Sequence, residues 1–140
     1  MKRSETRELT FRLIYSTQIQ KDMEEEQKDI FLEENGIDNE NEVEYITTIY
    51  NGIKEKNDEI RKIISENLKE KWTIDRISKI DLAILRVAIY ELMYSDLPYK
   101  VVINEAVELA KKYGDDSSKA FINGVLASVV KKNNLSAEEL

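Results

Sequence analysis

The basic residues near the N-terminus are the side chains in this sequence best suited to binding chemistry. Arg3, Arg7 and Gln18 fall on one stripe when a helix is projected at about 100° per residue, and Lys2 extends the stripe toward the N-terminus. Guanidinium groups donate paired hydrogen bonds to phosphate oxygens, and an exposed aromatic ring can stack an unpaired base. The stripe is therefore a candidate binding site for single-stranded RNA. Surface arginines that form salt bridges are, however, the commoner explanation of such a pattern.

Few residues are available for catalysis. The sequence contains no cysteine and no histidine, which removes disulfides, thiol nucleophiles, imidazole bases and the metal sites that these side chains build. It also has no glycine-rich phosphate loop and no nucleophile elbow. Asn104, Glu105 and Glu108 could form a carboxylate cluster, but surface pairing or helix capping is the better interpretation. We therefore expect a protein that is not an enzyme and binds no cofactor or metal.

Two charged residues, Arg86 and Glu91, interrupt an otherwise apolar stretch. A buried charge without a partner costs several kcal/mol, so both side chains must be paired and hydrogen-bonded if they lie inside the protein. We interpret them as structural anchors to neighbouring helices, with an active site as the minor alternative.

The elements that position these residues are all helices. The 140 residues suit a single domain, and only four glycines and one proline are present. The apolar periodicity predicts helices over residues 4–21, 25–34, 42–70 and 80–94. A further helix follows Pro98 and ends near Gly114, with Glu108 and Lys112 paired on its exposed face. A last helix is capped at its N-terminus by Asp116 or Ser117.

Individual residues refine this pattern. Asn35 and Gly36 suit the left-handed geometry that ends a helix, and Gly52 is tolerated inside the long helix. Gly124 costs roughly 1 kcal/mol in the last helix, which suits the close approach of another helix or of a ligand backbone, and packing against a helix is the preferred interpretation. Trp72 is interpreted as a plug between helix ends rather than as a base-binding ring.

Charge is unevenly distributed along the chain. Residues 1–21 carry five basic and two acidic groups, whereas residues 22–70 carry six basic and sixteen acidic groups, and the whole chain has a formal charge of −7. The acidic block is interpreted as solvated surface. No apolar run suits a signal peptide or a membrane span, so a soluble, cytoplasmic protein is expected.

Three strings of residues carry a resemblance to a known family. They are Ile84-Leu85-Arg86-Val87-Ala88-Ile89-Tyr90-Glu91-Leu92, the stretch from Pro98 to Lys111, and Phe121-Ile122-Asn123-Gly124-Val125-Leu126, preceded by Arg7-Glu8 and Tyr15. Together they resemble the NusB family of transcription antitermination factors. The resemblance implies one compact, all-α domain of about seven helices over residues 1–140, with a frayed tail at 134–140.

The resemblance also implies a function. Family members bind boxA-type RNA in nascent ribosomal RNA transcripts together with NusE, a ribosomal small-subunit protein, and keep RNA polymerase processive. The implied RNA contacts are Lys2, Arg3, Arg7, Tyr15, Lys119, Phe121 and Asn123, and the implied NusE contacts are Asp75, Ile80, Asp81 and Ile84. Ser4, Glu5 and Thr6 stand where the family often has more arginines, which predicts weak intrinsic RNA affinity.

Two alternatives come from other classes of protein. A NusB-like domain also precedes the catalytic domain of some ribosomal RNA cytosine methyltransferases, but this chain would end too early for that activity. The other alternative is a helical module that only binds proteins or forms a homodimer.

Overall fold

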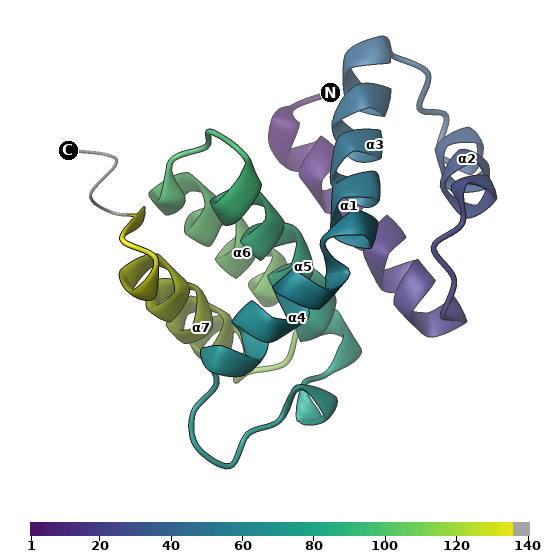
Figure 1. Cartoon of the computed structure of the whole chain (residues 1–140). Helices are drawn as coiled ribbons and strands as arrows, with labels where there is room; N and C mark the ends of the chain where they lie inside the picture. Colours follow the sequence, from purple (N-terminus) through teal and green to yellow (C-terminus); the bar gives the residue numbers. More distant parts are fainter. Residues whose placement is uncertain (136–140) are drawn as a thin grey trace.

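The computed structural model describes residues 1–135, and its regular elements are helices. In chain order these are α1 (Arg3–Gln20), α2 (Glu25–Glu34), α3 (Glu40–Glu55), α4 (Asn57–Glu66), the 3₁₀ turn η1 (Ile74–Arg76), α5 (Lys79–Tyr94), α6 (Tyr99–Tyr113) and α7 (Ser118–Lys132). Within that part of the chain there is no strand, so the predicted all-α class is confirmed (Figure 1). No helix within residues 1–135 is long and apolar enough to cross a membrane.

Helix α5 lies at the centre of the molecule. It packs against α1 and α3 on one side and against α4, α6 and α7 on the other (Figure 1). Every residue from Ala83 to Ile89 is buried, which agrees with the near absence of charge in this stretch. The prediction that this helix forms the middle of the core is confirmed.

The long helix predicted over residues 42–70 is wrong, because the chain breaks into α3 and α4 at Lys56. This residue has φ −97° and ψ 17°, and its backbone N–H caps α3 by donating to the Gly52 carbonyl. The buried residues on either side of the break, Ile53 and Ile60, are seven positions apart, close to two helical turns. The apolar period therefore stays in phase across the break and does not reveal it.

Gly52 and Gly124, which both lie inside helices, pack differently from the sequence prediction. A Cβ built on Gly52 would lie 2.2 Å from the Tyr90 ring, so this glycine lets α5 approach α3 closely. A Cβ on Gly124 would meet nothing within 4 Å, so the predicted close packing there is wrong. Gly36 does have the left-handed geometry expected after α2, with φ 63°.

The turn between α6 and α7 follows the prediction in part. Gly114 is the C-cap of α6, as predicted, and its backbone N–H donates to the Ala110 carbonyl at 2.9 Å. Ser117 occupies the N-cap position of α7 and makes no side-chain cap there. Asp115 instead accepts hydrogen bonds from the Ser117 backbone N–H and hydroxyl, at 2.9 and 2.8 Å, and thereby orders the turn.

Arg86 anchors α5 to its neighbours, as predicted. Its guanidinium donates to Gln18 of α1 at 3.1 Å and to Asn57 of α4 at 3.3 Å. Burial, together with the charge of Arg61, lowers the pKa of Arg86 to about 10. Neutral amide oxygens therefore hold this buried cation in place.

At the C-terminal end, Leu135 packs against the core. The predicted frayed tail otherwise concerns residues 136–140, which lie outside the described residues.

Candidate nucleic-acid interface

The start of α1 presents two cations to solvent. Lys2 and Arg3 are both exposed, and Lys2 occupies the N-cap position of the helix. The Arg3 guanidinium carbon lies 4.2 Å from the centre of the Tyr45 ring of α3. A cation held over an aromatic face is positioned without being neutralised. This end of α1 can therefore attract a phosphate group.

Arg7 lies inside the molecule and not on that surface. Its side chain is only 4% exposed, and it forms a bidentate pair with Glu91 of α5, Nε to Oε1 at 2.8 Å and Nη2 to Oε2 at 3.1 Å. Burial alone would lower the pKa of Arg7, but the hydrogen bonds and charge of Glu91 raise it above its ordinary value. The geometry is that of a structural ion pair, so the expectation of a direct phosphate contact by Arg7 does not fit its position.

The ion pair belongs to a network that joins four helices. Tyr45 of α3 donates its hydroxyl to Glu91 Oε2 at 3.1 Å, and Glu105 of α6 lies 3.6 Å from Arg7 Nη1. Burial raises the pKa of Tyr45, and the charge of Glu91 raises it further. The role of Glu91 as an anchor is confirmed. The network also holds Tyr45 beneath Arg3, so it positions the exposed cation.

The other predicted RNA residues do not form one surface. The half-buried Tyr15 ring packs 6.4 Å from Phe11 on α1. Lys119 and Asn123 are exposed and, being four residues apart, share one face of α7. Phe121 projects from the opposite side of the helix, where its ring lies 6.0 Å from Trp72. Lys119 and Asn123 therefore lie on one face of α7, and Phe121 lies on another.

Only two of the four predicted partner-binding residues are accessible. Asp75 in η1 is exposed and Ile80 is half-buried. Asp81 is 7% exposed and Ile84 is 1% exposed, so neither presents a surface to a partner. Asp81 instead lies where α5 and α7 begin: burial raises the pKa of its carboxyl, a hydrogen bond from Ser118 opposes the shift, and the charge of Asp115 adds to it.

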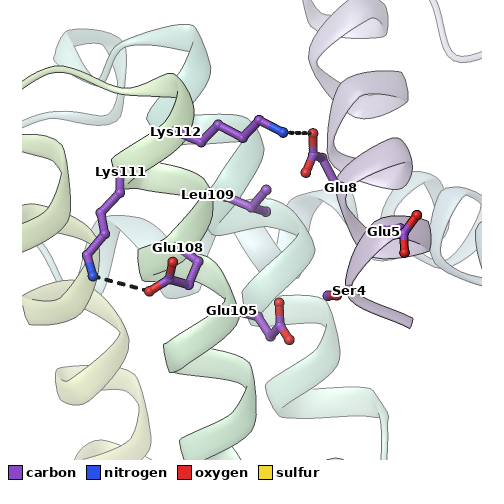
Figure 2. A pocket seen from close by; sticks show the side chains of 8 residues that line it. All are labelled: Ser4, Glu5, Glu8, Glu105, Glu108, Leu109, Lys111 and Lys112. Carbon is purple, nitrogen blue, oxygen red and sulfur yellow. Dashed lines mark hydrogen bonds and ion pairs between the residues drawn. The ribbon is translucent and has the colours of Figure 1, made fainter. Parts of the chain in front are cut away.

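An acidic groove runs between α1 and α6 (Figure 2). Lys112 Nζ lies 2.7 Å from Glu8 Oε2, and Lys111 Nζ lies 3.2 Å from Glu108 Oε1. The predicted pairing of Glu108 with Lys112 is therefore wrong, because Lys112 reaches across to α1. Glu105 pairs with Arg7, as described above. Glu8, Glu105 and Glu108 are thus each paired with a cation, while Glu5 accepts from the Lys2 backbone N–H at 3.4 Å.

Trp72 is the aromatic residue whose position the sequence interpretation missed. It is 49% exposed and does not plug the core. With Leu68, Phe121 and Val125 it lines an open groove of about 500 Å³ between α7 and the segment that follows α4. Lys69 and Lys71, which come just before Trp72 in the sequence, were a signal that could have identified an exposed ring.

A family model for the NusB family matches residues 4–131. The chain belongs to the NusB family. The transcription antitermination protein NusB of Acetivibrio thermocellus is 48% identical over 99% of this chain and 94% of the relative. The corresponding protein of Clostridium novyi is 45% identical over 94% of this chain and 99% of the relative. Family membership makes the chain a transcription antitermination factor and not an enzyme.

Solved structures agree with the NusB assignment. T. maritima NusB superposes with a TM-score of 0.81 at 34% identity, covering 94% of this chain and 92% of that chain. A crystal structure of the antitermination factors NusB and NusE in complex with double-stranded RNA contains a chain that superposes with a TM-score of 0.83 at 28% identity, covering 94% and 99% respectively. The NusB-like fold is thus shared along nearly the whole length.

Proposed function

We propose that this NusB-family protein binds boxA-type RNA in nascent ribosomal RNA transcripts together with NusE, and thereby keeps RNA polymerase processive. The observation that carries the proposal is the superposition on a NusB chain that was crystallised with NusE and RNA. Its place of action would be the cytoplasm, where transcripts emerge from the polymerase.

The proposed RNA contacts are exposed polar side chains together with two half-buried aromatic rings. Lys2 and Arg3 at the start of α1 bind phosphates, with Tyr15 at the edge of the site. Lys119, Phe121 and Asn123 contribute from the start of α7. Arg7 acts as a positioning residue, because its guanidinium is committed to Glu91. The NusE contact centres on Asp75 and Ile80, the accessible members of the predicted set.

The charge of the protein supports a joint site. Two exposed cations at one helix end provide little binding free energy for a polyanion, and the chain as a whole carries −7. A basic partner would add cations beside them and would be attracted to the acidic surface over a Debye length of about 8 Å at physiological salt. The complex then binds RNA more tightly than either protein alone, by linkage.

The decisive experiment is fluorescence anisotropy of a labelled boxA-type RNA titrated with this protein, alone and with purified NusE, beside a scrambled RNA at matched salt. Tighter, sequence-dependent binding with NusE is expected. Absence of binding to both RNAs in both arms would refute the proposal and favour a protein-only module. Light scattering over a concentration series, run beside it, reports whether homodimers form and compete.

Replacing Lys2 and Arg3 with alanine tests the α1 end of the site. The plot of log affinity against log salt should flatten by roughly 1.4, because each phosphate contact on a single strand contributes about 0.7 to the slope. Lys54→Ala, at an exposed position near the end of α3, is the matched control and should leave the slope unchanged. An unchanged slope in the double variant would remove the start of α1 from the site.

A further inference from the structure

An open groove beside Trp72, lined in part by Phe121, extends beyond the RNA site proposed above. The Trp72 ring is half exposed, and its inner side packs on Phe121 with ring centres 6.0 Å apart and planes 37° apart. Leu68 and Val125 extend the apolar lining. An indole with one face packed and the rest open is rigid enough to serve as a stacking surface.

Small residues on α7 keep this groove open. Ala120, Gly124 and Ser128 all line it, and they recur every four residues along one side of the helix. A Cβ at Gly124 would meet nothing within 4 Å among residues 1–135, so none of these residues fills the space above this glycine. The roughly 1 kcal/mol that a glycine costs inside a helix therefore has no packing explanation here.

The chain segments that contribute the groove are rich in basic residues, and the charged side chains that line the groove itself are Glu66, Lys69 and Lys132. Residues 61–79 and 118–132 contain three acidic groups, Glu66, Glu70 and Asp75, against nine basic ones, Arg61, Lys62, Lys69, Lys71, Arg76, Lys79, Lys119, Lys131 and Lys132. Lys69, Lys71 and Lys119 form no ion pair within residues 1–135. Lys132 donates to the Glu66 backbone carbonyl, which leaves its charge uncompensated.

We propose that this groove binds a segment of single-stranded RNA, with one base stacked on Trp72 and the adjoining phosphates held by Lys69 and Lys71. Unpaired cations around an exposed ring match the two devices that grip single strands, charge for the backbone and a π-face for the base. The inference rests on the proposed function and extends it. Helix α7 and the segment that follows α4 lie away from the N-terminal end of α1, so the RNA path would cover two separated surfaces (Figure 1).

Trp72 reports on this groove directly, because it is the only tryptophan in the chain. We would titrate the full chain with a single-stranded boxA-type RNA while recording tryptophan fluorescence and, in parallel, the anisotropy of a label on the RNA. Base stacking predicts saturable quenching with the same midpoint as the anisotropy change. Inorganic polyphosphate and polyglutamate, which carry charge but no bases, should cause no such quenching. Quenching by polyglutamate but not by RNA would overturn the proposal in favour of an acidic protein partner.

Substitutions separate stacking from folding. Trp72→Ala should weaken RNA binding by about tenfold, whereas Trp72→Phe should retain most of it because a π-face remains. Gly124→Leu should block the groove and weaken binding similarly, and Gly124→Ala, which adds only one carbon, is its matched control. Lys69→Gln together with Lys71→Gln should flatten the salt dependence by roughly 1.4. Far-ultraviolet circular dichroism identifies any variant that fails to fold.

The outcomes distinguish this inference from the proposed function. One outcome is that anisotropy shows RNA binding, Trp72 fluorescence is not quenched, and Gly124→Leu binds RNA with wild-type affinity. This outcome would refute RNA binding in the groove and leave the proposed function intact. Loss of the NusE-dependent boxA preference with retained quenching would refute the proposed function while the groove still binds RNA.

Discussion

At the scale of single residues, the arginines of α1 show how differently two similar side chains can be used. Arg3 is exposed over the Tyr45 ring, whereas Arg7, one helical turn later, is buried against Glu91. Their positions on the helical stripe are alike, and only the packing of α5 and α6 separates them. The sequence could therefore predict a basic stripe but not which of its arginines reaches a ligand.

Removing Arg7 should chiefly destabilise the protein. Arg7→Ala leaves Glu91 buried without its cation, and breaking one side of a buried ion pair costs about 3–5 kcal/mol. Arg3→Ala, at an exposed position, should change the free energy of unfolding by less than about 0.5 kcal/mol. Urea denaturation of the two variants measures this difference. Equal stabilities would contradict the structural role assigned to Arg7.

Asp81 provides a prediction about pH. Its pKa is raised in the folded protein, so its contribution to stability is fully present below the ordinary value of 3.8 and is lost as the pH rises through the raised value. Asp81→Asn removes the cost of a buried charge and should stabilise the protein at pH 7, with the gain disappearing below about pH 3.8. Urea denaturation across this pH range tests it, and a gain independent of pH would contradict the assignment.

At the scale of elements, most helices could be predicted because their ends carry local signals. Glu25–Glu34 ends before Asn35 and Gly36, and Pro98 separates α5 from α6. The break at Lys56 carries no such signal, since the apolar period continues through it. Burial of Ile84 and exposure of Trp72 depend on contacts between distant segments, which periodicity does not contain.

The glycines of α3 and α7 make a matched pair for testing element packing. Gly52→Ala should destabilise the protein by about 1–3 kcal/mol, because its Cβ would overlap the Tyr90 ring. Gly124→Ala should stabilise it by up to about 1 kcal/mol, because alanine is the better helix former and meets no neighbour. Thermal unfolding compares the two variants. Changes of the same sign would contradict the packing described.

At the scale of the whole molecule, charge is segregated more strongly than the net value suggests. Acidic groups dominate residues 22–55, whereas the segments that contribute the groove at Trp72, residues 61–79 and 118–132, contain nine basic and three acidic groups. A sum of −7 would argue against RNA binding, whereas separate acidic and basic surfaces allow a basic protein and an RNA strand to bind the same molecule.

Because the charges are segregated, we expect salt to affect binding to NusE mainly through the association rate constant. Stopped-flow mixing should show an association rate constant that falls as salt rises, while the dissociation rate constant changes little, because long-range attraction acts on encounter. Charge reversal of Asp75 to lysine should reduce the rate and its salt dependence. Asp38→Lys, the same charge reversal at an exposed position outside the proposed contact, measures how much of the change is due to net charge alone and should have the smaller effect.

The central position of α5 has a consequence for the synthesis of the protein. The apolar residues of α1 and α3 close against α5, which does not end until Tyr94. A growing chain that has left the ribosome only as far as α4 therefore lacks the helix against which both α1 and α3 pack, and the apolar faces of these two helices are incompletely covered. Uncovered apolar surface promotes aggregation in partly folded chains. The period before α5 emerges is thus when the nascent protein most needs protection by chaperones.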